Sequence, residues 1–160
     1  MFGLKIVVDE DEIGTAAEYF ANTADMYRVL GLMEESDYTC ETPDGRGRGR
    51  RECMKRIARI FCSDVEEVGE DFIEAAERFY EKQVDLLRDA FEEVSKRKEM
   101  GEMNKLVLTG IGREILAEKS VESSDFDQVI DLADVYGEGA VIMTPAFGMS
   151  QLAGEDFQDV

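Results

Sequence analysis

The alternation of apolar and polar residues is most regular in the middle of the chain. Apolar side chains recur every three or four positions through one long segment, at Ile73, Ala76, Tyr80, Val84, Leu87, Phe91 and Val94. This spacing aligns them in one stripe on a helix and leaves charged residues on the opposite face. The pattern therefore predicts a long amphipathic helix over residues 73–94.

Shorter patterns upstream predict one strand, three helices and an irregular loop. Thr15 followed three residues later by Glu18 is a capping-box signal for the first helix, and the glycines and proline between residues 43 and 49 oppose any regular element. The predicted elements are a strand over Leu4–Val8, an acidic turn over Asp9–Glu12, helices over Thr15–Leu30 and Arg51–Phe61 with an irregular loop over Glu34–Arg50 between them, and a short helix from Ser63 to about Gly69.

Downstream, the pattern predicts a β-α-β unit followed by a final helix. Its parts are a strand over Lys105–Leu108, a glycine turn over Thr109–Gly112, a helix over Arg113–Lys119 and a strand over Gln128–Leu132. A break follows over Gly137–Gly139. The apolar segment Ala140–Leu152 predicts a buried helix whose start is marked by Pro145.

Composition indicates one soluble domain over residues 1–160, of the helix-rich α/β class, with a small sheet flanked by helices. The 160-residue length, 44% hydrophobic content and lack of an internal linker suit a single packed core. A net charge of -19 argues against nucleic acid and anionic membranes as partners. No apolar run is long enough to span a bilayer, and three cysteines without CxxC spacing suit a reducing compartment. We therefore expect a cytoplasmic protein.

The absence of histidine limits the chemistry to carboxylates, arginines, lysines, tyrosines and Mg²⁺. Asp25 lies seven residues after Glu18, so both carboxylates could share a helix face and hold Mg²⁺ or accept a proton, although solvated surface charge explains such a pair as well in a chain with 37 acidic residues. The cysteines, Met143 and Met149 are expected to fill the core.

The segment from Asp44 to Arg51, here called the arginine-glycine loop, carries the main candidate site. It places four arginines within six residues of a chain that has 18 basic residues. Arginine offers a fork of donors that matches phosphate oxygens, and interleaved glycines let backbone N–H groups approach an anion. The loop predicts a diphosphate site at Arg46, Gly47, Arg48 and Arg51. The alternative is a flexible basic loop that only offsets neighbouring carboxylates.

A second candidate follows the strand that ends at Leu108. Gly110 and Gly112 lie between that strand and the next helix, a layout in which a strand ends at a ligand crevice. They are further candidates for contact with the diphosphate. The alternative is that the two glycines only form a tight turn.

Several segments together resemble the second half of the archaeal methanofuran-biosynthesis synthase family, within the hydantoinase-A-like group. They follow the family's order from about residue 14 to residue 153. The segments are Ala17–Gly31, Cys40–Gly47, Glu52–Arg59, Tyr80–Val84, Leu108–Gly112 and Pro145–Phe147. Agreement over so much of the chain is more specific than any single motif.

The resemblance implies one half of an actin-like ATPase-type fold of two domains. It also implies a transferase that joins an aminomethylfuran-methyl diphosphate to γ-glutamyltyramine and releases diphosphate. Such alkyl transfer to a phenol oxygen needs Mg²⁺ or arginines on the departing diphosphate and a polar partner for the phenol. From residue chemistry alone, Asp25 and Asp44 are the candidates for holding Mg²⁺ or orienting the nucleophile.

The family's first half, with its glycine-rich opening strand, has no counterpart in this sequence. An actin-like fold closes a ligand between two domains, so one half should bind weakly unless a chain with the other half, or a second copy, completes it. Three interpretations stay open: a separate polypeptide supplies the other half, the chain is a fragment, or it is a non-catalytic module that docks a partner.

Overall fold

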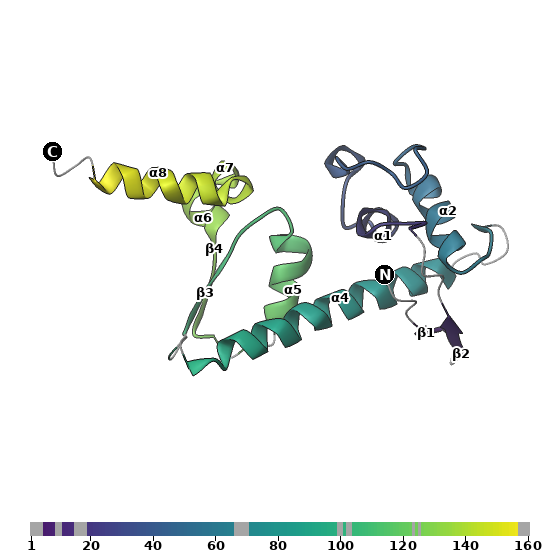
Figure 1. The fold of residues 1–160 in the computed structure, drawn as a ribbon, viewed down its shortest axis with the longest axis horizontal. Helices are drawn as coiled ribbons and strands as arrows, with labels where there is room; N and C mark the ends of the chain where they lie inside the picture. Colours follow the sequence, from purple (N-terminus) through teal and green to yellow (C-terminus); the bar gives the residue numbers. More distant parts are fainter. Residues whose placement is uncertain are drawn as a thin grey trace. The chain divides into compact units, whose positions relative to one another are not determined.

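The computed structural model describes residues 5–8, 11–14, 19–65, 71–98, 101, 104–122, 124 and 126–156 (Figure 1). The chain divides into two compact units, Met1–Gln83 and Val84–Val160. Each unit is described by itself below. That the whole chain is one domain, equivalent to the second half of the resembled family, stays a prediction.

The first unit opens with an antiparallel pair of strands. β1 (Lys5–Val8) pairs with β2 (Asp11–Gly14), so that Lys5 lies opposite Gly14 and Val8 lies opposite Asp11. The predicted strand is confirmed. The acidic turn predicted over Asp9–Glu12 is wrong at its end, because Asp11 and Glu12 belong to β2 and pair with Val8 and Val7.

Helix α1 (Thr23–Leu30) begins eight residues later than predicted. Asn22 is its N-cap: the Asn22 side chain accepts a hydrogen bond of 3.0 Å from Asp25 N, and Asp25 Oδ2 accepts one of 3.0 Å from Asn22 N. This reciprocal capping box fixes the start of the helix at Thr23, because Asn22 itself has an extended backbone conformation. The alternative box of Thr15 and Glu18 lies outside the described residues.

A loop containing the short 3-10 helix η1 (Glu35–Asp37) leads to α2 (Arg50–Ile60), and both predictions for this region are confirmed. Helices α1 and α2 pack against each other. Met26 and Val29 of α1 and Cys53 and Ile57 of α2 are buried in the core. Most of the predicted helix after Ser63 lies outside the described residues.

The long helix α4 (Asp71–Ser95) is confirmed, and its first part belongs to the first unit. Tyr27 of α1 meets Tyr80 edge to face with ring centroids 6.4 Å apart. The Tyr27 hydroxyl donates a hydrogen bond of 2.8 Å to Gln83 Oε1. These contacts hold the start of α4 to α1 through the apolar stripe that the sequence predicts.

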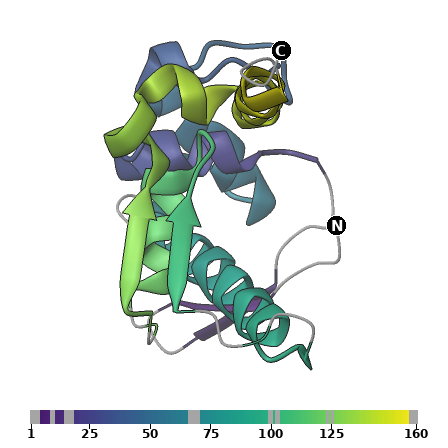
Figure 2. The same ribbon diagram turned by 90° about the vertical axis from the view of Figure 1, so that its left-hand side faces the viewer.

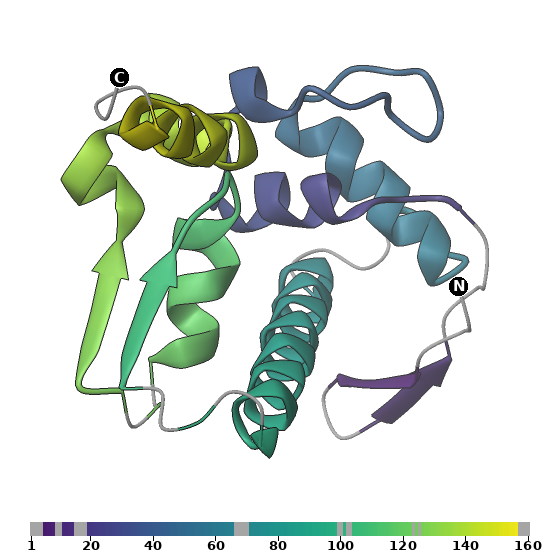
Figure 3. The ribbon, with the colours of Figure 1, turned by 60° about the vertical axis from the view of Figure 1, so that its left-hand side comes forward.

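The second unit contains the predicted β-α-β arrangement. β3 (Lys105–Leu108) pairs in parallel with β4 (Gln128–Asp131), and the connection contains the π-type turn η3 (Arg113–Ala117) and α5 (Glu118–Val121). Figure 2 shows the two strands running in the same direction, and Figure 3 shows the helical connection beside them. The crossover helix is what allows the two strands to be parallel.

Three helices complete the second unit: α6 (Leu132–Tyr136), α7 (Glu138–Ile142) and α8 (Thr144–Asp156). The predicted break is confirmed at Gly137, which has a φ of 82°, a conformation that glycine adopts readily. Pro145 lies in the first turn of α8, as expected. The prediction of a buried final helix is wrong, since Met149 and Leu152 are 67% and 59% exposed. The apolar residues of α8 do not form one stripe that could be buried.

Two other core assignments are corrected. Met143 is exposed, as are Cys40 and Cys62, so only Cys53 among the cysteines has the predicted packing role. The helix-rich α/β class is confirmed, with its small parallel sheet. The likeness to half of an actin-like fold stays a prediction. No helix in the described part of the chain combines the length and apolar character that crossing a membrane requires.

Candidate anion-binding site

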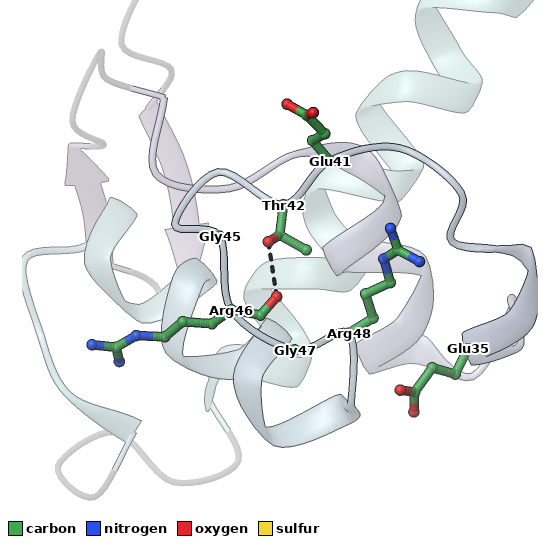
Figure 4. A pocket seen from close by; sticks show the side chains of 7 residues that line it. All are labelled: Glu35, Glu41, Thr42, Gly45, Arg46, Gly47 and Arg48. Atoms are coloured by element: carbon green, nitrogen blue, oxygen red, sulfur yellow. Dashed lines mark hydrogen bonds between the residues drawn. The ribbon is translucent and has the colours of Figure 1, made fainter.

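The arginine-glycine loop forms a pocket in the first unit, immediately before α2. The residues that line it are Glu35, Glu41, Thr42, Gly45, Arg46, Gly47 and Arg48 (Figure 4). Arg46, Gly47 and Arg48, three of the predicted diphosphate contacts, are therefore together. Arg51 lies outside the lining, on the first turn of α2.

Local hydrogen bonds fix the turn that lines the pocket. The Thr42 hydroxyl donates to Arg46 O at 2.8 Å (Figure 4). Gly45 N donates to Thr42 O at 3.1 Å. Asp44 Oδ1 accepts from Arg46 N at 3.1 Å, which is the local side-chain bond that aspartate makes in turns. Gly45 adopts a φ of 68°, where a Cβ would be strained. Thr42, Asp44 and Gly45 therefore determine the conformation of this turn.

The two arginines of the pocket have different surroundings. The Arg48 guanidinium lies 5.7 Å from the centre of the Tyr38 ring and donates to Cys40 O at 3.3 Å. The Arg46 side chain is exposed, and Figure 4 shows it directed to another side of the loop from Arg48. Glu35 and Glu41 also line the pocket, so positive and negative side chains are balanced there.

The start of α2 adds backbone donors beside the loop. Its N-cap is Gly49, and no side chain caps the helix. The N–H groups of a first helical turn favour an anion. The Glu52 carboxylate lies next to this turn, since Oε2 is 3.0 Å from where a Cβ on Gly49 would be. An incoming anion would compete with Glu52 for this place.

A buried ionic network lies beneath the loop. Arg56 of α2 has no exposed side-chain surface. Its Nε donates to Asp25 Oδ1 at 2.9 Å, and its Nη2 lies 2.7 Å from the same oxygen in an ion pair. Its Nη1 donates to Asp44 Oδ1 and to Gly47 O, both at 3.0 Å. Arg59 donates to Asp44 Oδ2 at 3.1 Å. Two charge-assisted contacts thus tie α1 and the loop to the same arginine.

The electrostatics of this network fix its protonation states. Burial lowers the pKa of Arg56, but the hydrogen bond and charge of Asp25 outweigh it and raise the pKa further above its usual range. Burial and the charge of Asp25 raise the pKa of Tyr38. Burial also raises the pKa of the Cys53 thiol to about 12, so this cysteine stays a thiol near neutral pH.

Asp25 and Asp44, the predicted metal ligands, do not fit a Mg²⁺ site in this arrangement. Asp25 is fully buried, and its two oxygens accept from Arg56, Tyr38 and Asn22 N. Both oxygens of Asp44 accept from arginines. No cluster of three or more acidic or cysteine side chains suited to a metal occurs within the described residues. We therefore assign no step to Mg²⁺ held by these aspartates.

Gly110 and Gly112 lie in the second unit, in the turn after β3. Gly110 has a φ of 90°, which glycine permits. Beside this turn, the Thr109 and Thr144 hydroxyls are 2.5 Å apart. Arg113 is buried and donates to Asp131 Oδ2 at 2.9 Å, to Glu114 and to Glu138. The contact of these glycines with diphosphate stays a prediction.

Sequence reasoning missed Arg56, Tyr38 and Asn22. Asn22 could have been found, because Asn22 and Asp25 have capping-box spacing just before an apolar helix. Arg56 lies next to Ile57 and three residues after Cys53, both of which are buried, so it shares the apolar face of α2. An arginine there signals a buried ion pair, but nothing in the sequence names its partner.

Comparisons with known proteins agree with one another. Residues 4–155 match the family model described as hydantoinase/oxoprolinase. A similar protein from Methanocaldococcus jannaschii is 36% identical over 138 residues, which are 86% of this chain and 40% of that protein. One from Methanococcus vannielii is 34% identical over 152 residues, which are 92% of this chain and 67% of that protein.

Both of these relatives carry the same name. Each is called the synthase of a (furan-2-yl)methanamine that bears a gamma-L-glutamylaminoethyl-phenoxymethyl group. The chain spans less than half the length of the first relative and about two thirds of the second. The match therefore concerns only a part of each of those proteins.

Proposed function

Because the chain belongs to the hydantoinase/oxoprolinase family, we propose that it is a transferase, or one subunit of a transferase, in methanofuran biosynthesis. The reaction joins an aminomethylfuran-methyl diphosphate to γ-glutamyltyramine. The bond between the furan methylene carbon and the diphosphate oxygen breaks, and its electron pair leaves with diphosphate. A new bond forms between that carbon and the phenol oxygen, whose proton passes to solvent or to a polar group.

The observation that carries this proposal is the identity with the two synthases over 86% and 92% of the chain. The product named for those synthases contains a phenoxymethyl-furan linkage, which is the bond that this reaction makes. A family match alone would not select this reaction, because one fold hosts many chemistries.

The arginine-glycine loop supports a role in holding the departing diphosphate. Arg46 and Arg48 line one pocket, and the uncapped start of α2 follows directly. Negative charge builds up on the leaving oxygen as the carbon–oxygen bond breaks, so cationic and N–H donors placed there lower the barrier. Glu35 and Glu41 oppose an anion in the same pocket, which makes the arginines necessary rather than redundant.

A binding measurement tests this site directly. We expect the purified chain to bind inorganic diphosphate in calorimetry, with about a tenfold loss of affinity in Arg48→Ala, since each arginine–phosphate contact is charge-assisted. Glu41→Gln should change affinity in the opposite direction. Arg78→Ala is the matched control, because Arg78 is an exposed arginine on α4 that forms ion pairs with Glu74 and Glu81. Equal affinity in all four proteins would contradict the proposed site.

An activity assay tests the reaction. The chain is supplied with both substrates, with and without Mg²⁺, alone and together with a polypeptide equivalent to the remainder of the Methanocaldococcus jannaschii relative. Release of diphosphate together with the coupled product, followed by mass spectrometry, is the expected result. Absence of both under every condition would remove the transferase proposal, whatever the calorimetry shows.

A second candidate function is a non-catalytic module that docks a partner chain. Exposed apolar side chains on α7, α8 and the turn between them favour it, with Ile142, Met143, Met149 and Leu152 all more than half exposed. Large exposed apolar patches mark interaction surfaces. Light scattering distinguishes the two functions: a one-to-one complex that lacks transferase activity would favour the module, and a monomer that ignores the partner would remove it.

A further inference from the structure

Asp25 lies at the centre of contacts that reach both arginines of the pocket. We propose that Asp25 is a positioning residue, which acts through Tyr38 on Arg48 and through Arg56 on the backbone that carries Arg46. The diphosphate ligand of the pocket rests on the proposed function, whereas the positioning of the two arginines does not. The proposal replaces the metal-ligand role that the sequence suggests for Asp25 with a role in shaping the arginine-glycine loop.

The first path runs through Tyr38. Its hydroxyl lies 3.0 Å from Asp25 Oδ1 and 3.0 Å from Asn22 Oδ1, and its side chain has no exposed surface. The guanidinium of Arg48 lies over the ring of this buried tyrosine, 5.7 Å from its centre. A cation over an aromatic face is attracted by the ring electrons. Asp25 therefore holds the ring against which Arg48 rests.

The second path runs through Arg56. Asp25 engages Nε and Nη2 of the guanidinium, and this leaves Nη1 directed at the loop. There Nη1 contacts Asp44 Oδ1 and Gly47 O, while the same Asp44 oxygen accepts from Arg46 N. The planar fork of arginine makes these directions dependent on one another. Turning Arg56 away from Asp25 would remove its contacts at both ends of the segment 44–47 and leave Asp44 held by Arg59.

The burial of this ion pair supports a role in specifying geometry. Asp25 and Arg56 both have no exposed side-chain surface, so both have lost their hydration. A buried ion pair seldom adds more stability than apolar residues of the same size. Fixed direction is what such a pair offers over an apolar contact. Here that direction leads to the two residues of the pocket that carry positive charge.

A double-mutant cycle tests the first path. We expect Tyr38→Leu to weaken binding of inorganic diphosphate about as much as Arg48→Ala, near tenfold, and the double variant to lose little more. Tyr38→Phe keeps the ring but removes the hydroxyl that contacts Asp25, so it should lose affinity by an intermediate factor of about threefold. If Tyr38 served only stability, its variants would have lower melting temperatures. The loss of affinity in the double variant would then equal the sum of the losses in the two single variants. Additive losses, or full affinity in Tyr38→Leu, would overturn the first path.

Hydrogen exchange tests the second path without any ligand. In Asp25→Asn, amides of residues 44–48 should exchange several-fold faster than in the original protein, because Arg56 no longer has a fixed orientation. Asp64→Asn is the control: it removes the same charge at an exposed position and should leave these amides unchanged. If Asp25→Asn does not fold, Arg56→Lys, which keeps the charge but not the fork, takes its place.

The outcomes separate the two proposals. Faster loop exchange in a protein that never binds diphosphate would keep the positioning role and remove the pocket's proposed ligand. Diphosphate binding with unchanged loop exchange and affinity in Asp25→Asn would overturn the positioning role and keep the ligand. Faster exchange together with weaker binding is the expected result for both.

Discussion

Both units bury an arginine among carboxylates, but the two arginines are built differently. Arg56 in the first unit is fully buried, and its partners Asp25 and Asp44 are 0% and 15% exposed. Arg113 in the second unit is 5% exposed, whereas two of its partners, Glu114 and Glu138, are 68% and 66% exposed. Arg56 therefore has mostly buried carboxylate partners, whereas Arg113 has two carboxylate partners that are exposed to solvent.

The difference decides what happens when an arginine is removed. An exposed carboxylate that loses its partner regains water, whereas a buried one keeps an uncompensated charge. Asp25 has no exposed surface, while Glu114 and Glu138 are already largely solvated. The same substitution therefore has a much larger consequence in the first unit.

The largest expected effect is the loss of Arg56. Arg56→Met should lower the free energy of unfolding by about 3–5 kcal/mol, because Asp25 is left buried and unpaired. Arg113→Met should cost clearly less. Urea unfolding followed by circular dichroism at neutral pH gives both values, and the slope with denaturant shows whether the native states stay compact. Equal losses in the two variants would show that burial of the partner carboxylate is not what distinguishes the two sites.

A smaller effect is expected at the edge of the same network, and it depends on pH. Burial alone would raise the pKa of Asp44, but the hydrogen bond from Arg46 N and the charges of Arg56 and Arg59 outweigh it and hold this pKa below the ordinary 3.8. A lowered pKa in the folded state means stabilisation that is complete above pH 3.8 and is lost as the pH falls through the folded value.

Asp44→Asn should therefore reduce stability by on the order of 1 kcal/mol near neutral pH, and this difference should shrink at acid pH. Thermal unfolding of both proteins across the acid range measures it. Asp64→Asn is the control for charge, because it removes one carboxylate at an exposed position and should cost little stability near neutral pH. A difference between Asp44→Asn and the original that stays constant into the acid range would contradict the lowered pKa.

The elements that the sequence predicts well are those whose signal is local. The stripe of α4, from Ile73 to Val94, and the strands β3 and β4 carry their periodicity within a few residues. The start of α1 was mispredicted because two capping signals compete, at Thr15 and at Asn22. The second of them is supported by distant residues, since Arg56 and Tyr38 both contact the capping carboxylate of Asp25.

The candidate site divides in the same way. Interleaved arginines and glycines are visible in the sequence, so Arg46, Gly47 and Arg48 could be found as one group. The role of Asp25 could not, because it depends on Arg56, which follows 31 residues later on another helix. An acidic residue on a helix suggests a metal ligand or surface charge until its partner is known.

The smallest expected effect concerns the ends of the two packed helices, which use the same motif with different residues. At the end of α1, Gly31 N and Leu32 N donate to Arg28 O and Tyr27 O. At the end of α2, Cys62 N and Ser63 N donate to Arg59 O and Ala58 O. These paired bonds form a Schellman motif, which needs a left-handed residue. Gly31 has a φ of 72° and Cys62 a φ of 55°.

A side chain in this conformation is strained, so Cys62→Gly should raise the free energy of unfolding by about 0.5–1 kcal/mol, and Gly31→Ala should lower it by about 1 kcal/mol. No atom lies within 4 Å of a Cβ built on Gly31, so its loss measures backbone strain alone. Cys62→Ala keeps the strain, removes an exposed thiol and should leave stability unchanged. Urea unfolding under reducing conditions resolves all three variants. Destabilisation by Cys62→Gly would mean that the Cys62 side chain makes contacts that outweigh its strained backbone.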